Sequence, residues 1–250
     1  MPLPTTLALI EIGLAAFVFV LLFFISAPYG RHARRGWGLT LPARWAWMIM
    51  ELPAFAVILA IVAVNAGTVG PVVLTLLALW EAHYVYRVFV YPFLLTSPGK
   101  QFPVLIVGFA LAFNVLNGAT NGLGLVNQSG LHDSRWLLDP RFIVGVVIFV
   151  AGFALHASSD RHLRILRKSG GSEYRIPSLW PFRLVSCPNY LGEILEWCGW
   201  AVATWSLGGL AFALFTIANL APRALTNHRW YRATFAEYPR QRHALAPWVW

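Results

Sequence analysis

The chain has 250 residues, of which 58% are hydrophobic and only 12% are charged. Soluble domains carry about 25% charged residues, so this composition excludes an ordinary soluble protein and indicates a helical membrane protein of one domain. The formal net charge is +9, but Lys and Arg concentrate beside the hydrophobic segments, which membrane topology explains better than nucleic-acid binding does.

Seven apolar segments follow one another along the chain. Each predicts a transmembrane helix, because their lengths approach the roughly 20 apolar residues that span a bilayer. The segments cover about residues 6–26, 45–65, 72–95, 102–119, 142–156, 183–206 and 210–224. The strongly basic loops alternate, so the sequence predicts an all-α protein with seven transmembrane helices, an outside N-terminus and a cytoplasmic C-terminus.

The first segment has no basic residue before its apolar run, so we interpret it as a retained span rather than a signal peptide. Compact loops and frequent Ala, Arg and Trp favour a bacterial inner membrane; a eukaryotic chain would be placed in the endoplasmic reticulum membrane. Cys187 and Cys198 lie on one predicted helix about 16 Å apart, so they cannot form a disulfide with each other.

Three polar residues occupy one face of the sixth predicted span. Asn189, Glu193 and Glu196 follow the helical spacing i, i+4, i+7. A charge at bilayer depth costs about 2.5–3.5 kcal/mol, so these side chains should face a polar cavity inside the bundle.

Other polar residues converge on the cytoplasmic ends of their spans, namely Glu51, Tyr84, Arg87, Asp160 and Arg223. Their convergence predicts a cavity that opens toward the cytoplasm. An ion pair between Glu51 and an arginine, and an interfacial position for Tyr84, are the structural alternatives.

The remaining polar features point less directly to chemistry. His83 and His156 are interpreted as helix–helix hydrogen-bonding residues, and Glu11, toward the outer end of its span, has no assigned role. The turn SGGSEY within a basic loop suits a phosphate-bearing ligand. The sequence contains no GxGxxG or P-loop motif, and no HxxxH or CxxC pair indicates a metal.

The residues from Asp139 to Trp250 closely resemble the C-terminal part of the steroid 5α-reductases. The matching motifs are DPRF, HASSDRHLRILRK, YRIP, SCPNYLGEILEWCGWAVATWSL and HRWYRATFAEYPRQRHALAPW. Upstream, ELPAFA at 51–56 and HYVYRVFVYPFLL at 83–95 resemble the substrate-side motifs of the same family. The segment 96–121 matches poorly, and His156 and Asn227 replace an asparagine and a histidine of the family.

This resemblance implies NADPH as the hydride donor and a 3-oxo-Δ4 steroid as the substrate. Residues 1–120 would form mainly the substrate side and residues 139–250 mainly the NADPH side. Glu51 and Tyr84 would act on the substrate carbonyl. The family's cofactor-contacting positions correspond to Asp160, Arg164, Arg167, Tyr174, Asn189, Glu193, Arg223, Tyr231 and Arg242.

The residue types suit the reduction of an enone, in which negative charge develops on the carbonyl oxygen. Glu51 would orient Tyr84, whose hydroxyl would donate to that oxygen. The alternatives are reduction of a polyprenal or an enoyl thioester, methyl transfer from S-adenosylmethionine, and lipid binding or transport without catalysis. The expected partners are a steroid-like lipid and the bilayer, with no nucleic acid, no metal and no required oligomer.

Overall fold

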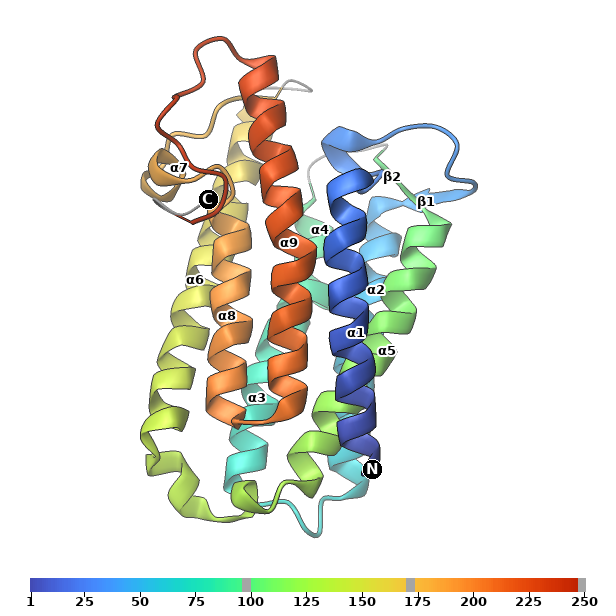
Figure 1. Cartoon of the computed structure of the whole chain (residues 1–250), viewed down its shortest axis with the longest axis vertical. Coiled ribbons are helices and arrows are strands. Elements are labelled where there is room, and N and C mark those ends of the chain that lie inside the picture. The colour runs from blue at the N-terminus through green and yellow to red at the C-terminus, as the bar shows by residue number, and fades with distance from the viewer. Residues whose placement is uncertain (96–99, 170–173, 247–250) are drawn as a thin grey trace.

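The computed structural model describes residues 1–95, 100–169 and 174–246, which form a bundle of long helices aligned with its long axis (Figure 1). The helices are α1 (Leu3–Phe24), α2 (Ala43–Val64), α3 (Pro71–Val85), α4 (Tyr91–Leu94), α5 (Val104–Asn127), α6 (Pro140–Ser169), α7 (Trp180–Leu184), α8 (Pro188–Thr204) and α9 (Leu207–Thr234). Short 3-10 turns lie at Gly30–His32, Ser129–His132 and Ser134–Leu138. The predicted turn SGGSEY lies largely outside the described residues.

The prediction of an all-α multi-pass membrane protein is confirmed. Within the described part of the chain, six helical segments are long and apolar enough to cross a membrane, namely α1, α2, α3 through α4, α5, most of α6, and α9. The predicted sixth span corresponds to α8, which has 17 residues and packs between α6 and α9 in the bundle (Figure 1). The short length of α8 and its two glutamates suit a helix surrounded by protein rather than by lipid.

Several predicted spans were shorter than the helices that the structure shows. Helix α5 continues beyond residue 119 to Asn127, α6 begins at Pro140 and continues to Ser169, and α9 continues to Thr234. Asp160 therefore lies within α6 and does not follow it. Apolar composition ends where a helix leaves the hydrocarbon, but backbone hydrogen bonding can continue into water.

The predicted span 183–206 is not one continuous helix. Helix α7 ends at Leu184, and α8 begins at Pro188, whose ring disfavours a helical conformation at the preceding residue. Cys187 accordingly has φ −131° and ψ 62° and precedes α8, so the two cysteines do not share a helix; both are free.

A π-helical turn separates α3 from α4. It spans Tyr86–Val90, immediately before Tyr91 and Pro92. Proline has no N–H to donate to the preceding turn, and π-turns often absorb such an interruption near functional sites. The turn carries Arg87, which lines the central cavity described below.

Helices α6 and α8 approach each other closely because glycines face the opposite backbone. A Cβ added at Gly152 would clash with the backbone of α8 at Glu196, and one at Gly192 would clash with α6 at His156. Close approach of small residues is a common basis of helix packing in membranes. This contact therefore fixes the separation of His156 and Glu196.

The connecting segments close one end of the bundle. Strands β1 (Thr40–Pro42) and β2 (Gln101–Pro103) pair antiparallel there, with Leu41 opposite Phe102. The C-terminal tail returns to the start of α8, where Ser186 donates its backbone N–H to His243 at 2.8 Å. Figure 1 shows β1, β2 and α7 at the end of the bundle opposite the N-terminus.

Candidate active site

A cavity of about 1020 Å³ occupies the centre of the bundle and is lined by residues from α1, α2, α3, α5, α6, α8 and α9. Ten of the eleven predicted site residues line it. They are Glu51, Tyr84, Asp160, Arg164, Arg167, Tyr174, Asn189, Glu193, Arg223 and Tyr231. The sequence analysis had placed six of these residues at one cavity from their positions on the spans, whereas Arg164, Arg167, Tyr174 and Tyr231 came from the family resemblance.

Arg242 is not among the residues that line this chamber. Its guanidinium stacks on Tyr238 with Cζ 5.1 Å from the ring centroid, and its Nε and Nη1 have no hydrogen-bond partner in the described part of the chain. Glu11 is buried on α1 and also lies outside the cavity lining.

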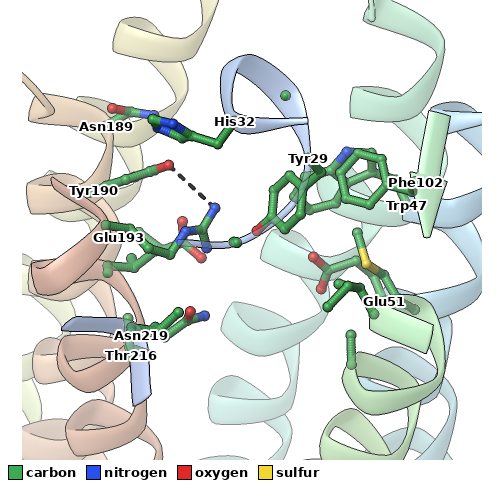
Figure 2. Close-up of a pocket in the computed structure, with 18 of the residues that line it drawn as sticks. Tyr29, His32, Trp47, Glu51, Phe102, Asn189, Tyr190, Glu193, Thr216 and Asn219 are labelled. Atoms are coloured by element: carbon green, nitrogen blue, oxygen red, sulfur yellow. Dashed lines mark hydrogen bonds between the residues drawn. The ribbon is translucent and has the colours of Figure 1, made fainter. Parts of the chain in front are cut away.

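One wall of the cavity carries Glu51 beside Trp47 (Figure 2). Arg87 donates from Nη2 to Glu51 Oε1 at 3.1 Å, and its guanidinium lies over Trp47 with Cζ 4.4 Å from the ring centroid. The pair is largely buried, so the arginine compensates a carboxylate that would otherwise be costly at this depth. The sequence pattern placed Arg87 near the site but did not assign its partner.

Tyr84 presents its hydroxyl to the same cavity from α3 while its ring is held in the core. The ring packs against Trp80, His83 and Trp197, with centroids 5.1, 4.9 and 6.0 Å away. In the described structure the hydroxyl makes no hydrogen bond, and Glu51 pairs with Arg87. A direct Glu51–Tyr84 bond stays a prediction for the substrate-bound state, in which catalytic hydrogen bonds tighten.

The opposite wall is built by α8. Figure 2 shows Asn189, Tyr190 and Glu193 stacked along it, with Thr216 and Asn219 of α9 nearby. Arg223 donates to the Tyr190 hydroxyl at 3.4 Å, the bond drawn in Figure 2. Amide, hydroxyl and carboxylate groups on this wall provide donors and acceptors for a polar heterocycle or a ribose.

A cluster of cations surrounds Tyr174 at the end of the chamber nearest the connecting segments. Arg31, Arg167 and Lys100 lie 5.2, 5.9 and 5.5 Å from its ring centroid, and all three line the cavity. Arg164 lines it as well and donates to the Tyr86 hydroxyl at 3.2 Å. Within the described residues none of these four cations forms an ion pair with a carboxylate, so the cluster suits a ligand that carries phosphate groups.

The segment between α1 and α2 contributes residues that the sequence analysis had assigned only to topology. Tyr29, Arg31 and His32 line the cavity, and His32 Nε2 lies 3.0 Å from Asn227 Oδ1. Partial burial lowers the pKa of His32, and burial raises the pKa of Tyr29. A basic loop next to a span satisfies the positive-inside rule whether or not it folds over a cavity, so composition alone could not reveal this role.

Three buried side chains also form a group that could hold a metal ion. His83, His156 and Glu196 each offer one ligand atom, and these atoms lie within 4.8 Å of one another. The residues come from α3, α6 and α8, so the grouping is not visible as a short sequence motif. His83 and His156 had been interpreted as helix–helix hydrogen-bonding residues, and contacts with Glu196 across helices do occur.

The bundle and its chamber define an integral membrane protein with a large, mainly apolar cavity that carries polar groups on its walls and suits a lipid-soluble substrate. A family model described as 3-oxo-5-alpha-steroid 4-dehydrogenase matches residues 100–250. The chain therefore belongs to the steroid 5α-reductase family, whose members are oxidoreductases that act on a CH–CH bond.

The similarity to known members extends over almost the whole chain. The sequence is 41% identical to steroid 5-alpha-reductase DET2 of Arabidopsis thaliana, covering 92% of this chain and 90% of that protein. It is 39% identical to 3-oxo-5-alpha-steroid 4-dehydrogenase 1 of Bos taurus, covering 97% and 95%. It is 41% identical to 3-oxo-5-alpha-steroid 4-dehydrogenase 2 of Homo sapiens, covering 92% and 91%.

Proposed function

We propose that the chain reduces the Δ4 double bond of 3-oxo-Δ4 steroids to 5α-reduced 3-oxo steroids, with NADPH as the hydride donor. The observation that carries this proposal is the shared chamber. At one end lie four cations that have no carboxylate partner among the described residues. Tyr84 and the Glu51–Arg87 pair lie on another wall. Family membership indicates the same reaction class.

The residues present fit NADPH. Arg164, Arg167, Arg31 and Lys100 would hold its phosphates, while Asn189 and Glu193 would hold its nicotinamide or ribose. Bound there, NADPH supplies a hydride. S-adenosylmethionine has no phosphate, so the cation cluster favours the reductase over the methyltransferase of the same broad superfamily.

The chain's own contribution is to position the enone and to stabilise charge on its oxygen. Hydride adds to C5, the β-carbon, and the electron pair of the double bond moves toward the carbonyl oxygen. Tyr84 donates a hydrogen bond or its proton to that oxygen. C4 then takes one proton from solvent, and a proton that Tyr84 has given to the oxygen returns to Tyr84 as the enol becomes the ketone. Glu51 keeps a negative charge beside the tyrosine, while Arg87 limits the electrostatic cost of that charge.

In this proposal residues 1–120 contact mainly the substrate and residues 139–250 contact mainly the cofactor. The segment between α1 and α2 is a departure from this division, because Arg31 belongs to the cation cluster. For the cellular location we propose the inner membrane of a bacterium, or the endoplasmic reticulum membrane if the source is eukaryotic.

The test is a substrate panel with purified protein in lipid nanodiscs. We expect NADPH oxidation with 3-oxo-Δ4 steroids and a 5α product, weaker oxidation of NADH, and lower turnover with a polyprenal or an enoyl thioester. A 5β product, or reduction of only the non-steroid substrates, would contradict the proposed substrate. Absence of NADPH binding would support a lipid-binding or transport protein instead.

A further inference from the structure

A row of polar side chains crosses the core from α3 through α8 to α6. His83 Nδ1 lies 2.7 Å from Glu196 Oε1, and the other oxygen of Glu196 lies 3.5 Å from His156 Nδ1. His156 Nε2 lies 3.4 Å from Asp160 Oδ2, and Asn189 donates to Asp160 Oδ1 at 3.0 Å. The row begins at His83, which precedes Tyr84 in the sequence, and ends at Asn189 on the α8 wall of the cavity, where the cofactor is proposed to bind.

His156 is the member of this row that joins its two halves. Its Nδ1 faces the carboxylate of Glu196, while its Nε2 faces Asp160 and lies 4.0 Å from Glu193 Oε2. The side chains of His156 and Glu196 are 1% and 0% exposed. In the described part of the chain, His156 Nδ1 and Glu196 Oε2 have no other partner. Each atom therefore offsets the energetic cost of burying the other.

The backbone holds this junction in place. Gly152 and Gly192 bring α6 against α8 at Glu196 and His156, as described above. His83 is fixed by Glu196 and by its ring contact with Trp197, whose centroid is 4.7 Å away. Movement of Asp160 or Asn189 would therefore be transmitted through His156 to the side chains that surround Tyr84.

We propose that His156 is a positioning residue that couples the carbonyl side of the active site to the cofactor side. This inference rests on the proposed function, because it concerns the alignment of a hydride donor with an enone. Hydride transfer needs reacting atoms about 3–3.5 Å apart, and a misplacement of about 1 Å can cost about 10²-fold in rate. Glu196 and Asp160 lie on different helices. Because His156 contacts each of them with a different ring nitrogen, it keeps the carbonyl side and the cofactor side of the site in a fixed relative position.

Two substitutions separate the contacts of His156. In His156→Gln the amide nitrogen can take the place of Nε2, so the contact with Asp160 is retained and the contact with Glu196 is lost. In His156→Asn the amide nitrogen can take the place of Nδ1, so the contact with Glu196 is retained and the contact with Asp160 is lost. His156→Ala removes both, and Phe149→Leu, seven residues away on the same face of α6, is a control that alters packing without removing a polar group.

The readouts are the NADPH dissociation constant, kcat at saturating substrates, and the isotope effect on kcat with NADPH deuterated at the transferred hydrogen. For His156→Gln we expect a dissociation constant within about threefold of wild type, at least a tenfold lower kcat and a larger isotope effect. For His156→Asn we expect a weaker affinity by about tenfold or more, because a hydrogen bond to a charged group is worth about 1.5–3 kcal/mol. His156→Ala should show both losses, and Phe149→Leu neither.

Two outcomes would overturn the proposal. One is that the Gln and Asn variants lose the same property, or that Phe149→Leu reproduces their losses, which would assign His156 to packing alone. The other is stoichiometric metal in purified wild type that is lost in His156→Ala, measured by elemental analysis, because His156 would then be a metal ligand. Failure of the proposed function would be recognised separately, as absence of NADPH-dependent reduction in wild type.

Discussion

The contact between α6 and α8 can be tested with a single methyl group. In Gly152→Ala the new Cβ would lie 2.7 Å from the Gly192 carbonyl oxygen, whereas ordinary contact begins at 3.4 Å. The two helices must therefore separate by at least about 0.7 Å, because both of the groups in contact are backbone rather than flexible side chain. The same movement would lengthen the 3.5 Å approach of His156 Nδ1 to Glu196 Oε2 beyond ion-pair distance.

Overpacking of this kind costs about 1–3 kcal/mol. For a chain of 250 residues, about 2–4 °C is lost per kcal/mol, so Tm should fall by about 2–12 °C. The assay is thermal unfolding of detergent-solubilised protein, followed by reaction of a fluorogenic maleimide with the free thiols of Cys187 and Cys198 as they become exposed. NADPH affinity is measured on the same samples.

The matched control is Gly108→Ala in α5, where an added Cβ meets nothing within 4 Å. Alanine favours a helix over glycine by about 1 kcal/mol, so this variant should melt at or above the wild-type temperature. If Gly152→Ala is as stable as Gly108→Ala and binds NADPH normally, the inferred close packing of α6 on α8 is refuted.

Three further outcomes are expected. Tyr84→Phe and Glu51→Gln should each reduce turnover by about 10²–10³-fold with little effect on NADPH binding. The double variant should be little worse than the worse single variant, and multiplicative losses would show that the two residues act independently. Arg167→Ala should raise the NADPH dissociation constant by about tenfold or more. Arg242→Ala should raise it less, because Arg242 lies outside the cavity lining, and unchanged binding in both variants would place the phosphates elsewhere. Reporters fused at Arg34 and Arg242 should both be cytoplasmic, and reporters on opposite sides of the membrane would refute the topology.

Most of the predicted site residues line the central cavity, and this has a simple origin. A polar side chain on an apolar helix is costly in a membrane unless it faces protein or water, so the spacing of Asn189, Glu193 and Glu196 predicted an inward face. Asn189 and Glu193 line the cavity, whereas Glu196 does not and is instead fully buried against His83. The same cost applies to Glu51, which indeed faces the cavity. What the spacing could not identify was the partner, since Arg87 reaches Glu51 from another helix through a π-turn.

The segment after residue 119 shows the limit of composition as a guide. The predicted span ended at residue 119, before this Asn- and Gly-rich stretch, but Asn121 lies within α5 and is buried there beside Asn117. Asn121 donates to Asn117 Oδ1 at 2.8 Å and accepts from Trp200 Nε1 at 2.8 Å. Asn121 favours turns in isolation, but in α5 its amide bonds both Asn117 and Trp200 of α8, so the tertiary contact compensates its burial within a helix.

The sequence by itself determined that the chain is a helical membrane protein, roughly where its apolar segments lie, and that polar residues on those segments face the protein interior, because hydropathy and helical spacing are local properties. Only the tertiary structure decided that His83, Glu196, His156 and Asp160 form one row. These residues are brought together by the approach of α3, α6 and α8. The α6–α8 contact depends on glycines whose role is apparent only when the facing backbone is known. The physical reason is that burial and ion pairing are set by distances between helices, and a linear pattern contains no such distance.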